Sequence, residues 1–238
     1  MGSWIAEFIA RAGAATIVLC DPALVSGGLL VRQNYTESDI GHYKVNALAD
    51  RLRAINDQLE VATVVGSLPA DTINPLPDCD AIIDATINLS LGVLLDAEVT
   101  RHPRPARRPL MAQVATDTRT GTLGFLTVAA SDHPGGPARI DQRTGDLVLK
   151  DGRLERFHTF WQPTATGDEL IPARGCSTPT FHGSAADLAA VAAALVSLLG
   201  PHLQVPVSGI HLIALPHADG DGPTHHFVPA PPQLPSAG

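Results

Sequence analysis

Four short apolar segments, each followed by polar or turn-forming residues, are distributed along the first half of the chain. They cover 15–20, 60–65, 80–85 and 110–115. Continuous apolar runs of this length are typical of strands that are buried on both faces of a parallel sheet. The segment 15–20 ends in Asp21-Pro22, which predicts a buried strand followed by a turn.

Helix-patterned segments separate these apolar runs. The spacing of apolar residues predicts helices over 3–12, 39–55, 88–99 and 184–199, the last closed by Gly200-Pro201, and a loop over 23–38. Strands that alternate with helices need crossover connections, which are the mark of a mostly parallel sheet. The sequence therefore predicts an α/β fold, a Rossmann-like doubly wound sheet that is mostly parallel.

The second half of the chain has a different character. From about 116 to 174, Gly, Pro and Thr are frequent, and the stretches 123–128, 146–149 and 154–160 are short and alternating. They predict an antiparallel excursion with long loops, and 208–214 predicts an edge strand. We expect one domain over 1–228 and a Pro-rich tail over 229–238 that is extended or disordered.

Composition excludes several classes of protein. The 238 residues carry a net charge of −8, which argues against a nucleic-acid partner. Three scattered cysteines without a CxxC pair, and the absence of HExxH, predict neither a disulfide framework nor a metal site. No signal peptide is evident, and the apolar run 185–199 is too short and Ala-rich for a membrane span. We expect a cytoplasmic protein with no membrane partner.

Two residues near the start are candidates for a nucleotide site. Gly2 has the position of the last glycine of a G-x-G-x-x-G turn, and Asp21 ends the next strand, where an acidic residue accepts hydrogen bonds from a ribose. On these two residues alone, the alternative interpretation is an ordinary N-terminal glycine and a turn-forming aspartate. The chain opens directly on a helix, whereas such folds normally open on a strand and a glycine-rich loop.

A wider pattern follows Asp21. Eleven residues later come Arg32-Gln33, then Gly41-His42-Tyr43-Lys44 at the start of a helix, and the third apolar segment ends Asp84-Ala85-Thr86-Ile87-Asn88. This pattern resembles the ThiF/MoeB/HesA family, adenylating enzymes that activate ubiquitin-like and sulfur-carrier proteins, in which N-L-x-R-Q, G-x-x-K and D-x-T-D-N occur in this order. The resemblance covers roughly 2–215.

The resemblance implies a role for each matching residue. Asp21 would hold the ribose of ATP, Arg32 would grip the phosphates, and Lys44 would reach them as a point charge. Gly2 and Gln33 are the other two residues expected to bind the cofactor. Adenylation needs cations on the phosphates and a fixed ribose, so these residue types suit that chemistry. The alternatives are a surface ion pair for Arg32 and a solvated helix residue for Lys44.

Cys176 is the candidate nucleophile. It follows Arg174-Gly175 and precedes Ser177-Thr178-Pro179 and a helix, and it is similar to the family's cysteine before the penultimate helix. A nearby cation and a helix N-terminus would lower the pKa of its thiol, which suits a thioester or persulfide step. The alternative is an inert loop cysteine. We expect Cys20 to be a packing residue and Cys79, between Asp78 and Asp80, to be unreactive.

The chain departs from the family pattern at three places. Ile87 replaces the aspartate that binds Mg²⁺, Leu29 replaces the asparagine of N-L-x-R-Q, and the first strand with the front of the glycine loop is missing. Isoleucine cannot hold a cation, so Mg²⁺ is doubtful. Either the sequence is the later part of a longer protein, or it is a degenerate domain kept for binding.

Three functions follow from these observations. The first is ATP-dependent adenylation of the C-terminus of a ubiquitin-like or sulfur-carrier protein, in a homodimer, with a conjugating-enzyme-like domain as a further partner implied by the resemblance. The second is a noncatalytic scaffold of the same fold, which Ile87 favours. The third is an NAD-dependent oxidoreductase, because Asp21 suits NAD, although no catalytic Lys–His or Tyr–Lys arrangement is evident. Titrations with ATP and NAD separate the third from the first.

Overall fold

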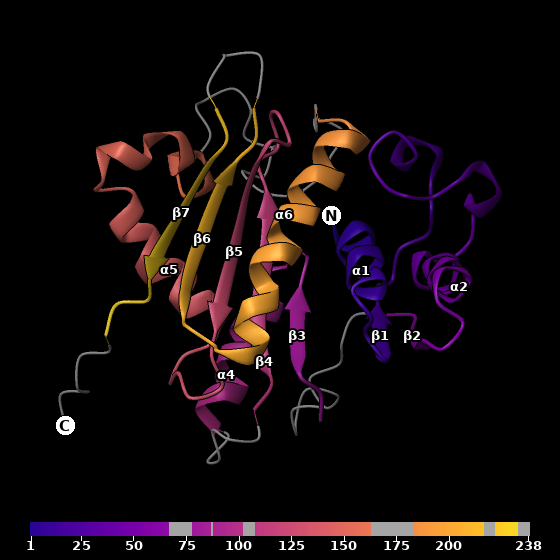
Figure 1. The fold of residues 1–238 in the computed structure, drawn as a ribbon, viewed down its shortest axis with the longest axis horizontal. Helices are drawn as coiled ribbons and strands as arrows, with labels where there is room; N and C mark the ends of the chain where they lie inside the picture. The colour runs from indigo at the N-terminus through magenta and orange to yellow at the C-terminus, as the bar shows by residue number, and fades with distance from the viewer. Residues whose placement is uncertain (67–77, 87, 102–107, 163–182, 217–221, 233–238) are drawn as a thin grey trace.

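A computed structural model describes residues 1–66, 78–86, 88–101, 108–162, 183–216 and 222–232. The described strands form two sheets, one of five strands in the order β3-β4-β5-β6-β7 and one of two strands, β1-β2. Figure 1 shows the large sheet with helices on both faces and the small sheet beside it. The predicted α/β class is confirmed.

The five-stranded sheet contains β3 (Ala81–Asp84), β4 (Leu110–Thr116), β5 (Leu123–Ala129), β6 (Gly209–Ala214) and β7 (Thr224–Pro229). Strands β3 and β4 are parallel, whereas the β4–β5, β5–β6 and β6–β7 pairs are antiparallel. The antiparallel part that the sequence predicts for the second half is therefore present, and it makes up more of this sheet than expected.

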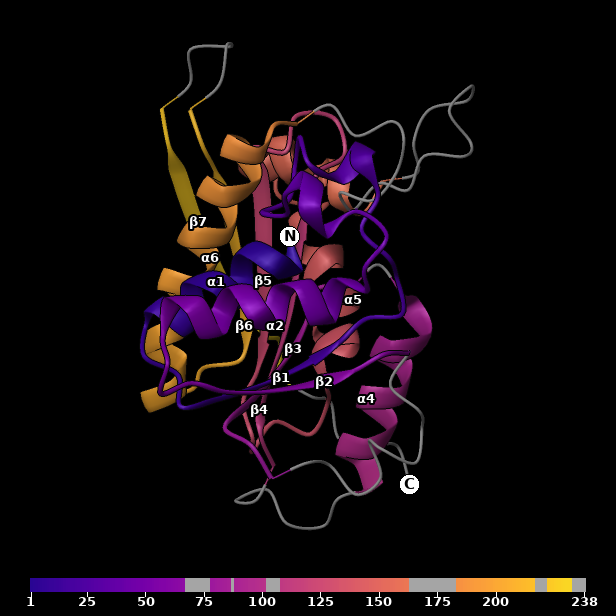
Figure 2. The ribbon, with the colours of Figure 1, turned by 90° about the vertical axis from the view of Figure 1, so that its right-hand side faces the viewer.

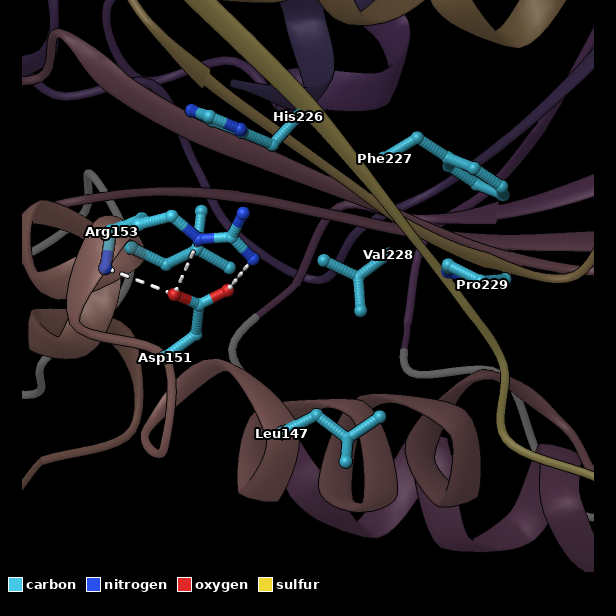
Figure 3. A pocket seen from close by; sticks show the side chains of 8 residues that line it. Leu147, Asp151, Arg153, His226, Phe227, Val228 and Pro229 are labelled. Atoms are coloured by element: carbon cyan, nitrogen blue, oxygen red, sulfur yellow. Dashed lines mark hydrogen bonds and ion pairs between the residues drawn. The ribbon is translucent and has the colours of Figure 1, made fainter.

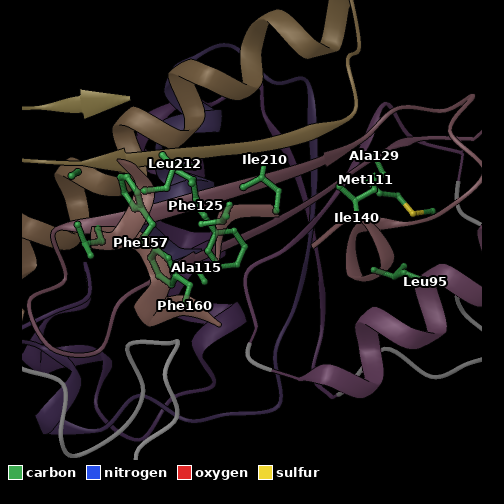
Figure 4. Close-up of a cluster of buried hydrophobic side chains, with 14 of the residues drawn as sticks. Leu95, Met111, Ala115, Phe125, Ala129, Ile140, Phe157, Phe160, Ile210 and Leu212 are labelled. Carbon is green, nitrogen blue, oxygen red and sulfur yellow. The ribbon is translucent and has the colours of Figure 1, made fainter. Parts of the chain in front are cut away.

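Helices cover the two faces of this sheet. On one face lie α1 (Gly2–Arg11) and α6 (Ala185–Gln204), which pack with β4, β5 and β6 around a core that includes Leu126, Val128, Leu188 and Leu195. On the other face lie α4 (Leu89–Arg101), α5 (Pro137–Val148) and the 3-10 segment η4 (Gly152–Phe160). Figure 4 shows the core of that second face, where the ring of Phe125 meets that of Phe160 edge-on at 5.1 Å.

The small sheet forms a unit with α2. Strands β1 (Thr16–Cys20) and β2 (Glu60–Val64) are parallel, and α2 (Lys44–Ile55) packs on them through Leu48 and Leu52. Figure 2 shows this unit from its outer side with α2 in front. In Figure 1, α1 lies between α6 and α2, so it joins the unit to the large sheet.

Strand β1 is less buried than its apolar sequence predicts. Only Leu19 is buried along this strand, and Val18 is 65% exposed. Within the described residues β1 pairs only with β2, so no second neighbouring strand covers its other edge. The prediction of a fully buried strand was wrong for this reason.

Two predicted strands of the second half are also wrong. Residues 146–149 lie at the end of α5, and residues 154–160 lie in η4. Helix α5 has Pro137 at its first turn, a position where proline is favoured. Its buried face contains Ile140, Thr144 and Val148 at intervals of four, so the stripe is helical.

Several predicted element ends also shifted. Residues 37–39 form a separate 3-10 turn (Glu37–Asp39), and Gly41 has a φ of 85°, so α2 starts at Lys44 rather than at 39. Helix α6 continues through Gly200-Pro201, because a residue without a Cβ relieves the clash with the following proline. Strand β6 is internal, because β7, which the sequence analysis missed, covers its outer side.

Helix α6 is long and apolar enough to cross a membrane by length and composition. It instead packs on the sheet through Leu188, Val191 and Leu195, all at most 1% exposed. A core helix passes the same test of length and apolarity, so this helix is weak evidence for a membrane.

Candidate functional site

The first turn of α1 lies against the end of β3. A Cβ added to Gly2 would be 3.3 Å from the Cβ of Ala85, so a glycine allows this close approach. The helix has no side-chain cap at its N-terminus, and the first amide groups of a helix are donors that favour anions. Ser3, in the same turn, is 6% exposed, and its Oγ has no hydrogen-bond partner within the structure.

The segment 32–34 lies beside this turn. The indole Nε1 of Trp4 donates to the carbonyl of Arg32 at 3.1 Å. The amide Nδ2 of Asn34 donates to the carbonyl of Ser3 at 3.1 Å, while the buried Oδ1 of Asn34 has no partner. Gln33 between them is buried. The α1 turn and this segment therefore form one wall that carries two unsatisfied buried oxygen atoms.

Glu7 fixes that wall in place. Its Oε2 accepts from Asn34 at 2.7 Å and from Arg51 of α2 at 2.7 Å, and its Oε1 accepts from Arg11 at 2.8 Å. Burial alone raises the pKa of Glu7, but the hydrogen bonds from Arg51, Asn34 and Arg11 outweigh it and lower the pKa to about 2. Glu7 is thus an ionised structural residue that ties α1, α2 and Asn34 together.

Asp21 and Lys44 are both hydrogen-bonded to Ala23. The Oδ1 of Asp21 accepts from the amide of Ala23 at 2.7 Å, and the carbonyl of Ala23 accepts from the amide of Lys44 at 2.9 Å. Burial, together with the carboxylates of Asp21 and Asp39, raises the pKa of Tyr35, whose hydroxyl donates to the carbonyl of Lys44. Asp21, just after β1, therefore lies near the start of α2.

Lys44 is one of only two lysines in the chain and is 9% exposed. None of the ion pairs found among the described residues includes it. Buried charges in proteins are normally paired. Lys44, a mostly buried lysine outside these ion pairs, is therefore a candidate to bind an anionic ligand.

Asp84 has a different orientation from these residues. Alternation along β3 places Ala81, Ile83 and Ala85 against the core that contains Met1 and Ile5, whereas Ile82 joins the core of the other face. Asp84 therefore faces away from α1. Burial raises the pKa of its carboxyl group, and its Oδ2 has no hydrogen-bond partner.

The predicted binding residues lie around the starts of α1 and α2, which are connected by the hydrogen bonds of Asn34 to Ser3 and of Tyr35 to Lys44. The carbonyl of Arg32 accepts from Trp4 in the turn that begins at Gly2, Gln33 lies between Arg32 and Asn34, and Asp21 and Lys44 are both hydrogen-bonded to Ala23. The predicted nucleophile Cys176 and the substituted position Ile87 lie outside the described residues. Burial raises the pKa of Cys79, helped by Asp80 and Asp78, in line with an unreactive thiol.

Sequence reasoning missed Ser3, Glu7 and Asn34. Ser3 directly follows Gly2 at the start of the helix, which is the one signal that pointed to it. Glu7 and Asn34 are 27 residues apart, and no local pattern predicts that a helix residue and a loop amide meet. Their hydrogen bond follows from the way the 32–34 segment returns to α1.

A cavity in the described structure lies elsewhere. It measures about 310 Å³ and is bounded by α5, η4 and β7, with Leu147, Arg153 and Val228 among its lining residues (Figure 3). In Figure 1, β7 and α1 are on opposite sides of the molecule, with the other strands of the large sheet between them. This cavity is therefore separate from the region around α1 and is considered below.

Comparison of the sequence with protein families identifies the family of this chain. The model of the ThiF family matches residues 1–143, which is more than half of the chain and includes every predicted binding residue except Cys176. The chain belongs to the ThiF family. The resemblance inferred from Asp21, Arg32 and Lys44 is therefore confirmed.

Solved structures show how far the ThiF fold extends along the chain. PaaA has a TM-score of 0.63 at 17% identity, covering 95% of this chain and 69% of PaaA. MccB of E. coli with ATP has a TM-score of 0.61 at 12% identity, covering 96% of this chain and 60% of MccB. A further structure holds MccB with MccA-N7isoASN, with a TM-score of 0.60 at 13% identity and coverage of 97% and 62%.

These likenesses describe the fold. The chain spans about 60% of the length of MccB, so a large part of that enzyme has no counterpart in it. None of the curated proteins compared with the chain matches it. The fold thus extends well beyond residues 1–143, over nearly the whole of this ThiF-family chain.

Proposed function

We propose that this ThiF-family chain takes part in ATP-dependent adenylation of a carboxylate. The observation that carries the proposal is the buried Ser3 Oγ, which has no hydrogen-bond partner, at the uncapped N-terminus of α1. Lys44, which is 9% exposed and outside the ion pairs found among the described residues, supplies a cation at the start of α2. Phosphate groups satisfy amide, hydroxyl and ammonium donors together. MccB, a protein with the same fold, has been solved with ATP, which supports this interpretation.

Adenylation proceeds by attack of a carboxylate oxygen on the α-phosphorus of ATP. An acyl–phosphate bond forms, the bond from the α-phosphorus to the bridging oxygen breaks, and pyrophosphate leaves with the electron pair. The residues on this chain bind and orient rather than transfer protons. In the proposal Lys44 and Arg32 offset the negative charge on the phosphates, the α1 amide groups and Ser3 donate to phosphate oxygens, and Asp21 accepts from the ribose.

Magnesium does not fit the residues that face this region. Ile87 carries no ligand atom, and the nearby carboxylate Asp84 faces away from α1. A site for Mg²⁺ needs oxygen ligands directed at the phosphates.

The finer part of the proposal concerns the substrate. We propose that the carboxylate belongs to the C-terminus of a ubiquitin-like or sulfur-carrier protein. The thiolate of Cys176 then attacks the acyl carbon of the adenylate, so that a thioester forms and AMP leaves. Structures of MccB with the peptide MccA support a polypeptide substrate in this fold. A homodimer in the cytoplasm with a conjugating-enzyme-like partner is part of the same proposal.

Nucleotide binding tests the proposal directly. Calorimetric titration with ATP, and separately with NAD, is expected to give saturable binding of ATP alone. Lys44→Ala should weaken ATP binding at least tenfold, whereas Lys150→Ala, at the other and exposed lysine, should leave it unchanged. Exchange of labelled pyrophosphate into ATP would then report the chemical step.

A noncatalytic scaffold is the second candidate, and Ile87 is the observation that favours it. A scaffold of the same fold predicts no pyrophosphate exchange with any carrier protein. Absence of ATP binding by a folded protein would overturn the adenylation proposal. ATP binding without exchange would favour the scaffold.

A further inference from the structure

Strand β7 has a free edge. Within the described residues it pairs only with β6. The amide of Ala230 donates to the carbonyl of Ser208 at 2.9 Å, so the even-numbered residues of β7 direct their main-chain groups toward β6. The N–H and C=O groups of His225 and Phe227, and the C=O group of Pro229, therefore point outward along the free edge.

The cavity of about 310 Å³ opens beside this edge. Its lining contains Leu147, Leu154, His226 and Val228, which are side chains of α5, η4 and β7 (Figure 3). Side chains alternate along a strand, so a segment paired with β7 would direct every second side chain toward this cavity. On the opposite face of β7, Phe227 is 37% exposed. It would lie beside those side chains of the added segment that point away from the cavity.

The charges around the cavity indicate the chemistry of the occupant. Arg153 donates from Nε and Nη2 to Asp151, at 3.0 and 2.7 Å, and no hydrogen bond from its Nη1 is present in the described structure. In Figure 3 the guanidinium group lies between Asp151 and the side of the cavity on which His226 lies. The ion pair has no net charge, but the Nη1 of Arg153 and the imidazole of His226 remain on this side of the cavity as groups that can donate hydrogen bonds to a carboxylate.

We propose that β7 is a docking strand for an extended segment of a partner protein, which adds to the free edge and places an apolar side chain in the cavity. An acidic residue two positions away would lie on the same face, within reach of Arg153 and His226. Main-chain hydrogen bonds to a sheet edge give affinity, and pockets for alternate side chains give specificity. Pro229 has no N–H group, so the added strand ends or turns there.

A second copy of the chain is a poorer occupant. Its own β7 would present His226 and Val228 to the cavity, with no acidic side chain for Arg153. An acidic and apolar partner segment fits the charges better.

The test is selection from a phage-displayed library of random eight-residue peptides against the full chain. We expect the enriched peptides to share an apolar residue and an acidic residue two positions apart. Phe227→Pro removes the outward N–H at a position where no hydrogen bond to β6 is lost, and it should weaken binding of an enriched peptide at least tenfold. Phe227→Val keeps the N–H group and should retain most of the binding, which separates the main-chain effect from loss of the ring.

A thermal melt of both variants verifies that they fold. Leu147→Asp, at the cavity wall, should also abolish binding without affecting ATP binding at the α1 region. The proposal is overturned if no common pattern is enriched, or if Phe227→Pro and Leu147→Asp, both folded, bind as the parent does. It is also overturned if light scattering shows a dimer that Phe227→Pro converts to a monomer, because the edge is then an interface between copies.

Discussion

The Nε2 atoms of His202 on α6 and His211 on β6 lie 2.7 Å apart in a buried contact. The amide of Val207 donates to Nδ1 of His202, so in the neutral ring the proton is on Nε2 and is donated to His211. Nδ1 of His211 then carries its own proton and donates to Nε2 of His225 at 2.9 Å. One backbone amide thus sets the tautomer of three consecutive imidazole rings.

Acid should weaken this histidine chain. Burial, with His202 and His225 nearby, lowers the pKa of His211 from 6.5 to about 4, and burial also lowers the pKa of His202 and His225. The unfolded chain therefore takes up protons first, so the stabilisation is complete above about pH 6.5 and is lost as the pH falls toward 4. Between pH 7 and pH 5 we expect His211 to account for a loss of about 1–2 kcal/mol in unfolding free energy.

The measurement is urea unfolding at both pH values for the parent and for His211→Leu. The variant should lose less stability between pH 7 and 5, whatever its stability at pH 7. His42→Gln, at an exposed histidine, serves as control and should follow the parent. If the pH dependence of His211→Leu equals that of the parent, protonation of His211 does not cause the loss of stability in acid.

Replacing Glu7 should loosen α1 from α2. Glu7→Gln leaves Arg51 and Arg11 without their carboxylate, and hydrogen bonds to charged groups contribute about 1.5–3 kcal/mol. Because the folded pKa is about 2, this contribution is complete above about pH 4.5 and is lost as the pH falls through 2. Chemical denaturation at pH 7 measures the loss; Asp50→Asn, in an exposed pair with Arg53, should cost under about 0.5 kcal/mol.

A methyl group at Gly145 should destabilise the protein, although alanine favours helices. An added Cβ in α5 would collide with the ring of Trp161, whose Nε1 donates to Asp141 at 3.1 Å. Overpacking of this kind costs about 1–3 kcal/mol. The melting temperature of Gly145→Ala should fall, whereas that of Gly152→Ala, where the space is open, should stay the same or rise. Equal effects of the two changes would contradict the packing described for Trp161.

Removing the hydroxyl of Ser3 should have opposite effects on stability and on binding. Its Oγ has no partner, so Ser3→Ala should leave the unfolding free energy unchanged or raise it. If the hydroxyl donates to a phosphate, ATP binding should weaken by about 2–10-fold, the equivalent of one hydrogen bond. Calorimetry measures the ATP affinity, and a thermal melt of the same preparation measures the stability. A destabilised variant with unchanged ATP affinity would show that Ser3 does not bind ATP.

The first half of the fold was predictable because its signals are local. The apolar runs of β2, β3 and β4 and the stripe of α2 each identify one element. In the second half the signals conflict. Gly145 weakens the helical pattern of α5, and two histidines and a proline obscure β7.

The candidate binding region was partly predictable for the same reason. Asp21, Arg32 and Lys44 keep a fixed spacing along the chain, so the sequence alone identifies them. Glu7, Asn34 and Arg51 meet only when α1, the loop and α2 are assembled, and spacing carries no information about such contacts. The side to which Asp84 points depends on the alternation along β3 and on which helices cover each face.

The division into two sheets has a consequence for local opening. Strands β1 and β2 share no backbone pairing with β3 to β7 within the described residues and are held mainly through α1 and α2. Their amide hydrogens should therefore exchange with solvent faster than those of β5, whose seven residues are all buried. Asp21 and Lys44 belong to this looser unit, whereas Ser3 belongs to α1. A ligand that contacts all three residues would hold the unit against α1 and slow amide hydrogen exchange along the whole of β1.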